Sequence, residues 1–96
     1  MKAIRKASCA GTWYPGDPIE LTKTIAGYFA GIKKIPVENH PLAIIAPHAG
    51  YQYSGETAAA AYKLLDGYSY DTVVVVSPSH KVFFKGYFRQ MHPFAF

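Results

Sequence analysis

Two histidines follow the two most apolar short segments of the chain. His48 lies in the motif PHAGY, directly after the apolar segment 42–46, and His80 ends the motif SPSH, which overlaps the valine run at 72–77. Neutral imidazole is a common ligand of zinc, copper and iron. If the two segments are neighbouring parallel strands, their axes lie about 4.8 Å apart, and both imidazoles can approach one ion at about 2.1 Å. The pattern therefore predicts the start of a metal site.

Small and hydroxyl-bearing residues surround both histidines. A glycine after His48 would let the backbone pass close to an ion or substrate, and hydroxyl groups would add polar contacts. A single loop histidine is more often an ordinary polar contact than a ligand, so the prediction depends on the matched placement of the pair. The residues expected to line the pocket are Gly50, Tyr51, Ser77 and Ser79, and Tyr53 could contribute a further hydroxyl.

A third metal ligand does not stand out. Catalytic metal sites usually have three protein ligands, and Cys9, His40 and His92 are the chemically suitable candidates, but none follows a predicted strand. Cys9 is expected to be a small buried residue, and His40 and His92 are expected in loops facing solvent. Glu56 is expected in the first turn of a helix, where interaction with the helix dipole is a sufficient role. We therefore assign no residue as a general acid or base.

The clearest predicted helix spans residues 17–34. Asp17 can cap its N-terminus, and Glu20 completes a capping-box pattern. Lys33 and Lys34 fall at the expected C-terminus, where the helix dipole favours cations. One apolar stripe at helical spacing contains Leu21, Ile25, Tyr28, Phe29 and Ile32.

A second helix is expected from Ser54, as the N-cap, to Leu65, with Gly67 as the C-terminal stop. It separates 42–46 from 72–77, which are both apolar without alternation, as strands buried on two faces are. The predicted fold class is therefore α/β, a right-handed βαβ unit with parallel strands, preceded by an amphipathic helix. Ligands gather at the carboxyl ends of such strands, where both histidines fall.

Composition narrows the remaining possibilities. The 96 residues fit one domain, and 50% hydrophobic with 17% charged residues is typical of a globular chain. The net charge of +4 comes from scattered basic residues, which argues against a nucleic-acid surface. One cysteine cannot form an internal disulfide, the N-terminus lacks the apolar core of a signal peptide, and no apolar run reaches membrane-spanning length. We expect a cytoplasmic protein that is not inserted in a membrane.

Three segments carry a resemblance to a known family. In order and spacing, ASCAGTWYPGD, AIIAPHAGYQYSGETAAAAYK and VVVVSPSHKV resemble the Memo family, some of whose members are known as AmmeMemoRadiSam system protein B. The family is similar in fold to class III extradiol dioxygenases. The resemblance implies that His48 and His80 bind a metal, iron or copper, together with a later cysteine that has no counterpart here, since Cys9 lies in another segment. It covers residues from about 4 to about 86, and the tail 87–96 diverges.

We therefore expect one truncated domain, residues 1–96, the N-terminal portion of a larger Memo-like or dioxygenase-like α/β fold. The first hypothesis is a partial metal site with little activity alone, which leaves open whether the chain is an enzyme. The second is an adaptor-like module whose aromatic arm, with Trp13 and Tyr14, binds a protein or peptide. The third is a non-functional truncation whose exposed apolar surface promotes self-association.

Overall fold

The protein forms two α-helices within the residues that its structure describes. The computed structural model describes residues 6–33 and 35–86. Helix α1 spans Pro18–Ala30 and helix α2 spans Tyr51–Lys63. Both helices predicted from the sequence are therefore present, although their bounds differ from the predicted ones.

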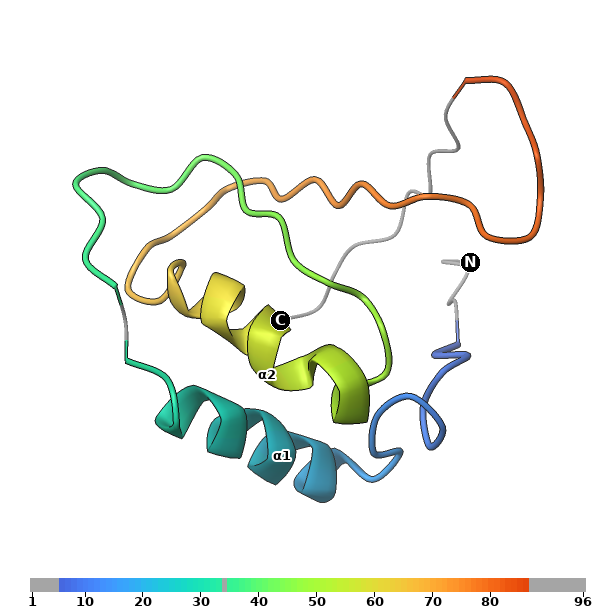
Figure 1. The fold of residues 1–96 in the computed structure, drawn as a ribbon, viewed down its shortest axis with the longest axis horizontal. Helices are drawn as coiled ribbons and strands as arrows, with labels where there is room; N and C mark the ends of the chain where they lie inside the picture. The colour runs from blue at the N-terminus through green and yellow to red at the C-terminus, as the bar shows by residue number, and fades with distance from the viewer. Residues whose placement is uncertain (1–5, 34, 87–96) are drawn as a thin grey trace. The chain divides into compact units, whose positions relative to one another are not determined.

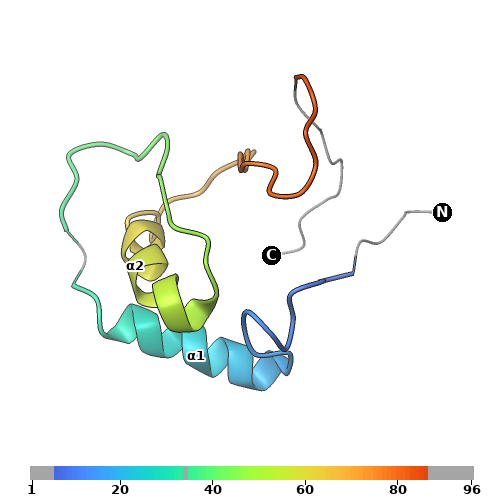
Figure 2. The same ribbon diagram turned by 45° about the vertical axis from the view of Figure 1, so that its right-hand side comes forward.

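The chain divides into two compact units. Ala7–Ser69 form the unit that contains both helices, while Lys6 and the described residues from Tyr70 to Gly86 belong to the other. Within the first unit, α1 and α2 lie side by side, and the described residues of the long connection between them form neither helix nor strand (Figures 1 and 2). The packing of α1 against α2 is thus one of the tertiary contacts that organise this unit.

Helix α1 begins as the sequence predicts. The Asp17 carboxylate accepts hydrogen bonds from the backbone N–H groups of Ile19 at 3.0 Å and Glu20 at 2.9 Å. Pro18 occupies the first turn, where its missing N–H costs nothing because that group would have no partner inside the helix. A cap of this kind typically stabilises a helix by about 1 kcal/mol.

Helix α1 ends earlier than predicted. Its last residue is Ala30 and Gly31 is the C-cap, so Lys33 lies beyond the helix, while Lys34 is outside the described residues. The prediction that cationic residues occupy the last turn is therefore wrong. Glycine is a poor helix former, which favours an end at Gly31.

Helix α2 begins three residues before the predicted cap. Gly50 is the N-cap, and the Ser54 hydroxyl lies inside the helix, where it donates to the carbonyl of Ala49 at 3.3 Å. The expectation that Glu56 lies in the first turn is wrong for the same reason, since the first turn of α2 has no acidic residue. The helix ends at Lys63, and turns continue to Gly67, whose φ of 88° suits a glycine.

The two helices meet through small residues. Gly55 and Ala59 are the buried residues of α2, and a Cβ atom built on Gly55 would lie 2.8 Å from the Tyr28 ring of α1. Such an approach is possible only because residue 55 has no side chain. Among the described residues, Ala59 is the one buried hydrophobic residue, so the core of this unit is small.

The predicted sheet is not tested by the structure. Residues 42–46 and 72–77 form no β-ladder within the described part of the chain, and their apolar side chains are largely exposed. Ile45 is the extreme case, with 99% of its surface exposed. The parallel βαβ unit therefore stays a prediction. If it forms, the apolar side chains of these two segments would become buried.

Candidate functional site

His48 lies in the turn that leads into α2. Its side chain is exposed, and it stands two residues before the N-cap Gly50. A helix fixes the backbone of its own first residues. Because His48 is only two residues from the N-cap, the direction of the chain at His48 depends on how α2 begins. The contacts at the start of α2 are therefore part of this candidate site.

The start of α2 is held by a segment far away in the sequence. The Tyr51 N–H donates a hydrogen bond to the carbonyl oxygen of Trp13 at 2.8 Å. Trp13 belongs to a compact turn formed by residues 8–14, here called the arm turn. The backbone carbonyl of Trp13, and not its indole ring, makes this hydrogen bond.

Tyr51 lies at the centre of a cluster of tyrosine rings. Its ring centroid is 5.5 Å from that of Tyr14 and 6.4 Å from that of Tyr28, whose hydroxyl also donates to the Tyr51 carbonyl at 3.3 Å. Burial raises the pKa of the Tyr51 phenol above its usual value, and Tyr14, Tyr62 and Tyr28 raise it further, because phenolates nearby would repel one another. The cluster joins the arm turn, α1 and α2.

An open hollow lies beside the His48 turn. Its volume is about 450 Å³, and two of the rings that line it are well exposed, with Trp13 at 51% and Tyr53 at 79%. Gly50, which was predicted to line a pocket, is one of its lining residues. The full lining consists of Thr12, Trp13, Ala49, Gly50, Gln52 and Tyr53.

His80 lies in a short turn of the other unit. The Ser79 hydroxyl donates to the Val82 carbonyl at 2.7 Å and accepts from the Val82 N–H at 3.3 Å. This pair of hydrogen bonds closes the backbone around His80, whose side chain is exposed. Ser79, expected to line a pocket, therefore shapes the His80 turn, while Ser77 is exposed in the segment before it.

Histidine is a suitable type of metal ligand, but the described residues do not form a complete set of ligands. Imidazole suits iron, copper and zinc. No group of three or more His, Cys, Asp or Glu residues that could hold an ion occurs in residues 6–33 and 35–86. His48 and His80 belong to separate units, so their action as a pair stays a prediction.

The other candidate ligands are accounted for as follows. Cys9 is a free cysteine of intermediate exposure in the arm turn. His40 stacks on Tyr68, with ring centroids 4.9 Å apart, and is exposed as expected. His92 lies outside the described residues. Stacking on an aromatic ring is a structural use of a histidine, which favours His40 as a packing residue.

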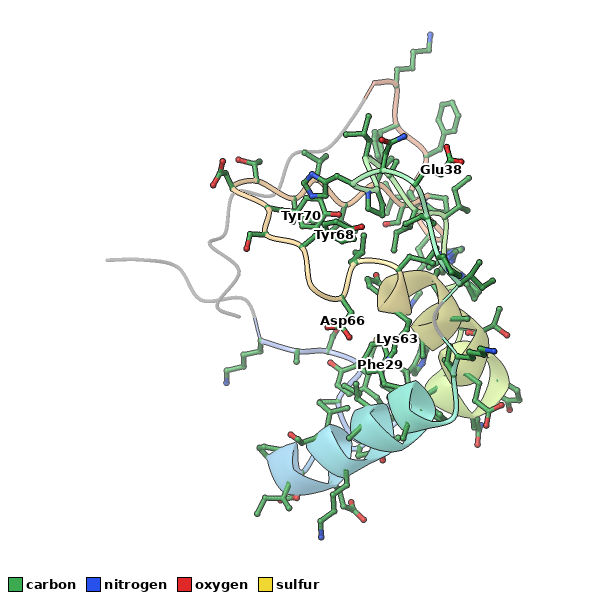
Figure 3. The ribbon with its side chains drawn as sticks, turned by 90° about the vertical axis from the view of Figure 1, so that its left-hand side faces the viewer. Phe29, Glu38, Lys63, Asp66, Tyr68 and Tyr70 are labelled. Atoms are coloured by element: carbon green, nitrogen blue, oxygen red, sulfur yellow. The ribbon has the colours of Figure 1, made fainter. Side chains whose placement is uncertain are left out.

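A second open hollow, of about 400 Å³, was not foreseen from the sequence. The Lys63 ammonium lies 5.7 Å from the centroid of the Phe29 ring and 3.8 Å from the Asp66 carboxylate (Figure 3). Lys63 and Asp66 are three residues apart, a spacing that could have suggested the ion pair. Because Lys63 already has two partners, the hollow offers little free charge to a ligand.

The comparison with known proteins identifies the family. The family model of the Memo-like protein matches residues 5–92, which is nearly the whole sequence. The chain therefore belongs to the Memo family, as its three motifs indicated. No helix within the described residues is long and apolar enough to cross a membrane.

Individual relatives support the same assignment. A MEMO1 family protein of Schizosaccharomyces pombe is 40% identical over 82 residues, which cover 85% of this chain and 26% of the relative. Protein MEMO1 of Homo sapiens is 38% identical over 78 residues, covering 81% and 26%. A MEMO1 family protein of Methanopyrus kandleri is 42% identical over 84 residues, covering 79% and 30%. The chain thus spans about a quarter to a third of the length of these relatives. No solved structure matches it.

Proposed function

We propose that the chain carries two ligands, His48 and His80, of a metal site in a dioxygenase-like Memo-family protein, and that iron or copper is the metal. The observation that carries this proposal is that each histidine is exposed in a short turn directly after an apolar segment. Turns of this kind present ligands at the ends of parallel strands, the arrangement predicted from the sequence. A further ligand is needed to complete such a site.

The proposed roles of the residues follow from their chemistry. When bound, iron or copper would supply a Lewis acid and a redox centre. Histidine binds such an ion through its neutral imidazole. The Ser79 hydrogen bonds hold the turn of one ligand, and the start of α2 holds the turn of the other. With two ligands, the chain alone is expected to bind weakly and to show little activity.

Metal titration of the purified chain tests the proposal. All variants are made in a Cys9→Ser background, because a free thiol also binds copper. His48→Ala and His80→Ala should each weaken metal binding at least tenfold. Even residues that only hydrogen-bond to a metal ligand typically contribute about 10–100-fold to metal affinity. His40→Ala is the matched control, because His40 stacks on Tyr68. Equal affinity in all of these chains contradicts the proposal.

A second candidate function is peptide binding by an adaptor-like module. The hollow beside α2 favours it, since the exposed rings of Trp13 and Tyr53 offer a surface on which an apolar peptide side chain can pack. In a peptide-array experiment, capture that is lost in Trp13→Ala and Tyr53→Ala, but unchanged in both histidine variants, supports this function. Capture that depends on neither ring excludes the hollow as the binding surface.

A further inference from the structure

The N-terminus of α2 lacks the usual side-chain cap. Its N-cap residue is Gly50, which makes no side-chain hydrogen bond to the first turn. The first N–H groups of a helix have no partner inside the helix and need one from elsewhere. The Tyr51 N–H finds it in the Trp13 carbonyl at 2.8 Å. The cap of α2 is therefore supplied by the arm turn, residues 8–14.

The arm turn is built to fix the direction of that carbonyl. The Cys9 carbonyl accepts hydrogen bonds from the Thr12 N–H at 3.2 Å, the Thr12 hydroxyl at 3.0 Å and the Trp13 N–H at 3.0 Å. The Gly11 N–H donates to the Tyr14 carbonyl at 2.8 Å, and Gly11 has a φ of 84°, which L side chains rarely adopt. The turn therefore depends on glycine at position 11.

A second contact ties the arm turn to the same helix residue. The Tyr14 ring packs at 5.5 Å from the Tyr51 ring, and a Cβ atom on Gly50 would make ordinary contacts with the Trp13 backbone at 3.6–3.7 Å. The arm turn thus touches residues 50 and 51 through both backbone and ring. His48 lies two residues before these contacts.

We propose that the arm turn is a positioning element for His48, acting through the first residue of α2. Trp13 caps the helix with its carbonyl, Tyr14 clamps the Tyr51 ring, and together they fix the turn from which the imidazole projects. The coupling is a property of the apo chain. Only its consequence for metal binding rests on the proposed function.

A pair of glycine substitutions in the full chain tests the coupling. Gly11→Ala forces a side chain into the left-handed region, which costs about 1–2 kcal/mol, equivalent to about 5- to 30-fold. Exchange of the Tyr51 amide proton should quicken by this factor, and the His48 ring signals should move in NMR spectra recorded without metal. Gly27→Ala is the control, since position 27 lies inside α1 and a Cβ there has no atom within 4 Å. It should not quicken the exchange and should leave the His48 ring signals unchanged.

A second pair separates the ring contact from general loss of folding. Tyr14→Ala should reproduce the effects of Gly11→Ala, whereas Tyr14→Phe keeps the ring and should restore both signals to those of the natural chain. Slow exchange at amides near the end of α2 shows that the helix remains folded. If the Tyr51 amide responds and the His48 ring does not, the arm turn caps α2 without positioning His48, and the proposal is wrong.

The metal titration is read separately. Weaker metal binding in Gly11→Ala, together with moved His48 signals, supports both the positioning role and the proposed function. A chain that binds no metal through His48, but in which Gly11→Ala still moves the ring signals, retains the positioning role and loses the proposed function. Unchanged ring signals in both Gly11→Ala and Tyr14→Ala overturn the positioning role whatever the metal result.

Discussion

Substitution of Gly55 by alanine tests the helix contact on which the first unit depends. A Cβ atom at this position would lie 2.8 Å from one carbon of the Tyr28 ring and 3.1 Å and 3.2 Å from the next two atoms. Real Cβ atoms essentially never approach so closely, so either the ring or α2 must move. The ring is not free to move, because it makes an edge contact with the Tyr51 ring and its hydroxyl donates a hydrogen bond to the Tyr51 carbonyl.

The expected magnitude combines two opposing effects. Overpacking of this kind typically costs about 1–3 kcal/mol. Loss of the Tyr28 hydrogen bond accounts for about 1 kcal/mol of this cost. Alanine is a better helix former than glycine by about 1 kcal/mol, which offsets part of the loss. Gly27→Ala in α1 has the same helix advantage and meets no atom within 4 Å. The free energy of unfolding should therefore differ between the two variants by about 1–3 kcal/mol, with Gly55→Ala the less stable.

Urea denaturation followed by circular dichroism measures both variants. The cycle is completed in a Tyr28→Ala background, where the clash is absent and Gly55→Ala should become stabilising by about 1 kcal/mol. If Gly55→Ala stabilises the natural chain as much as Gly27→Ala does, the helices do not pack through this contact. A destabilisation that persists in the Tyr28→Ala background would also refute the reasoning, because it would have another cause.

Three further predictions concern other parts of the chain. The raised pKa of Tyr51 means that the folded chain holds the phenol proton more tightly than the unfolded chain does. This contribution to stability is therefore complete below about pH 10 and is lost as the pH rises through the pKa of the folded chain. Unfolding curves recorded from about pH 9 to 11 should show this loss of stability, and an equal loss in a Tyr51→Phe chain would disprove it. Ser79→Ala should quicken exchange of the Val82 amide by about two- to tenfold, as expected from the loss of about 0.5–1.5 kcal/mol of hydrogen bonding, whereas the exposed neighbour Ser77→Ala should not. Ile45→Lys places a charge on a residue that is 99% exposed and should reduce self-association in sedimentation experiments without lowering stability, and an unchanged sedimentation profile would remove Ile45 from any such interface.

The start of each helix shows what local sequence can and cannot predict. The Asp17 cap is visible in the sequence because the carboxylate and its two N–H partners are within three residues. The start of α2 is not, because the acceptor for Tyr51 is the carbonyl of Trp13, far away along the chain. Ser54 was the best local cap, and a long-range contact replaced it three residues earlier.

In the candidate site, too, some features could be predicted from the sequence and others could not. Turn motifs around His48 and His80 placed both residues at the ends of apolar segments, and the structure keeps both exposed. Side-chain roles were less predictable, because the hydroxyl of Ser79 closes a backbone turn and the ring of Tyr51 packs in a cluster. A hydroxyl near a histidine can serve either purpose, and residue type alone does not decide between them.

The two proposed ligands are held by different kinds of structure, and this difference has a physical consequence. The turn of His80 is closed by Ser79 and Val82, two residues from the same short segment, so its geometry depends on local hydrogen bonds. The turn of His48 depends on contacts with the arm turn and, through the tyrosine cluster, with α1. A change at the helix contact, such as Gly55→Ala, should therefore disturb the His48 ring signals in NMR spectra. The affinity of the proposed metal site would then depend on the helix pair through His48.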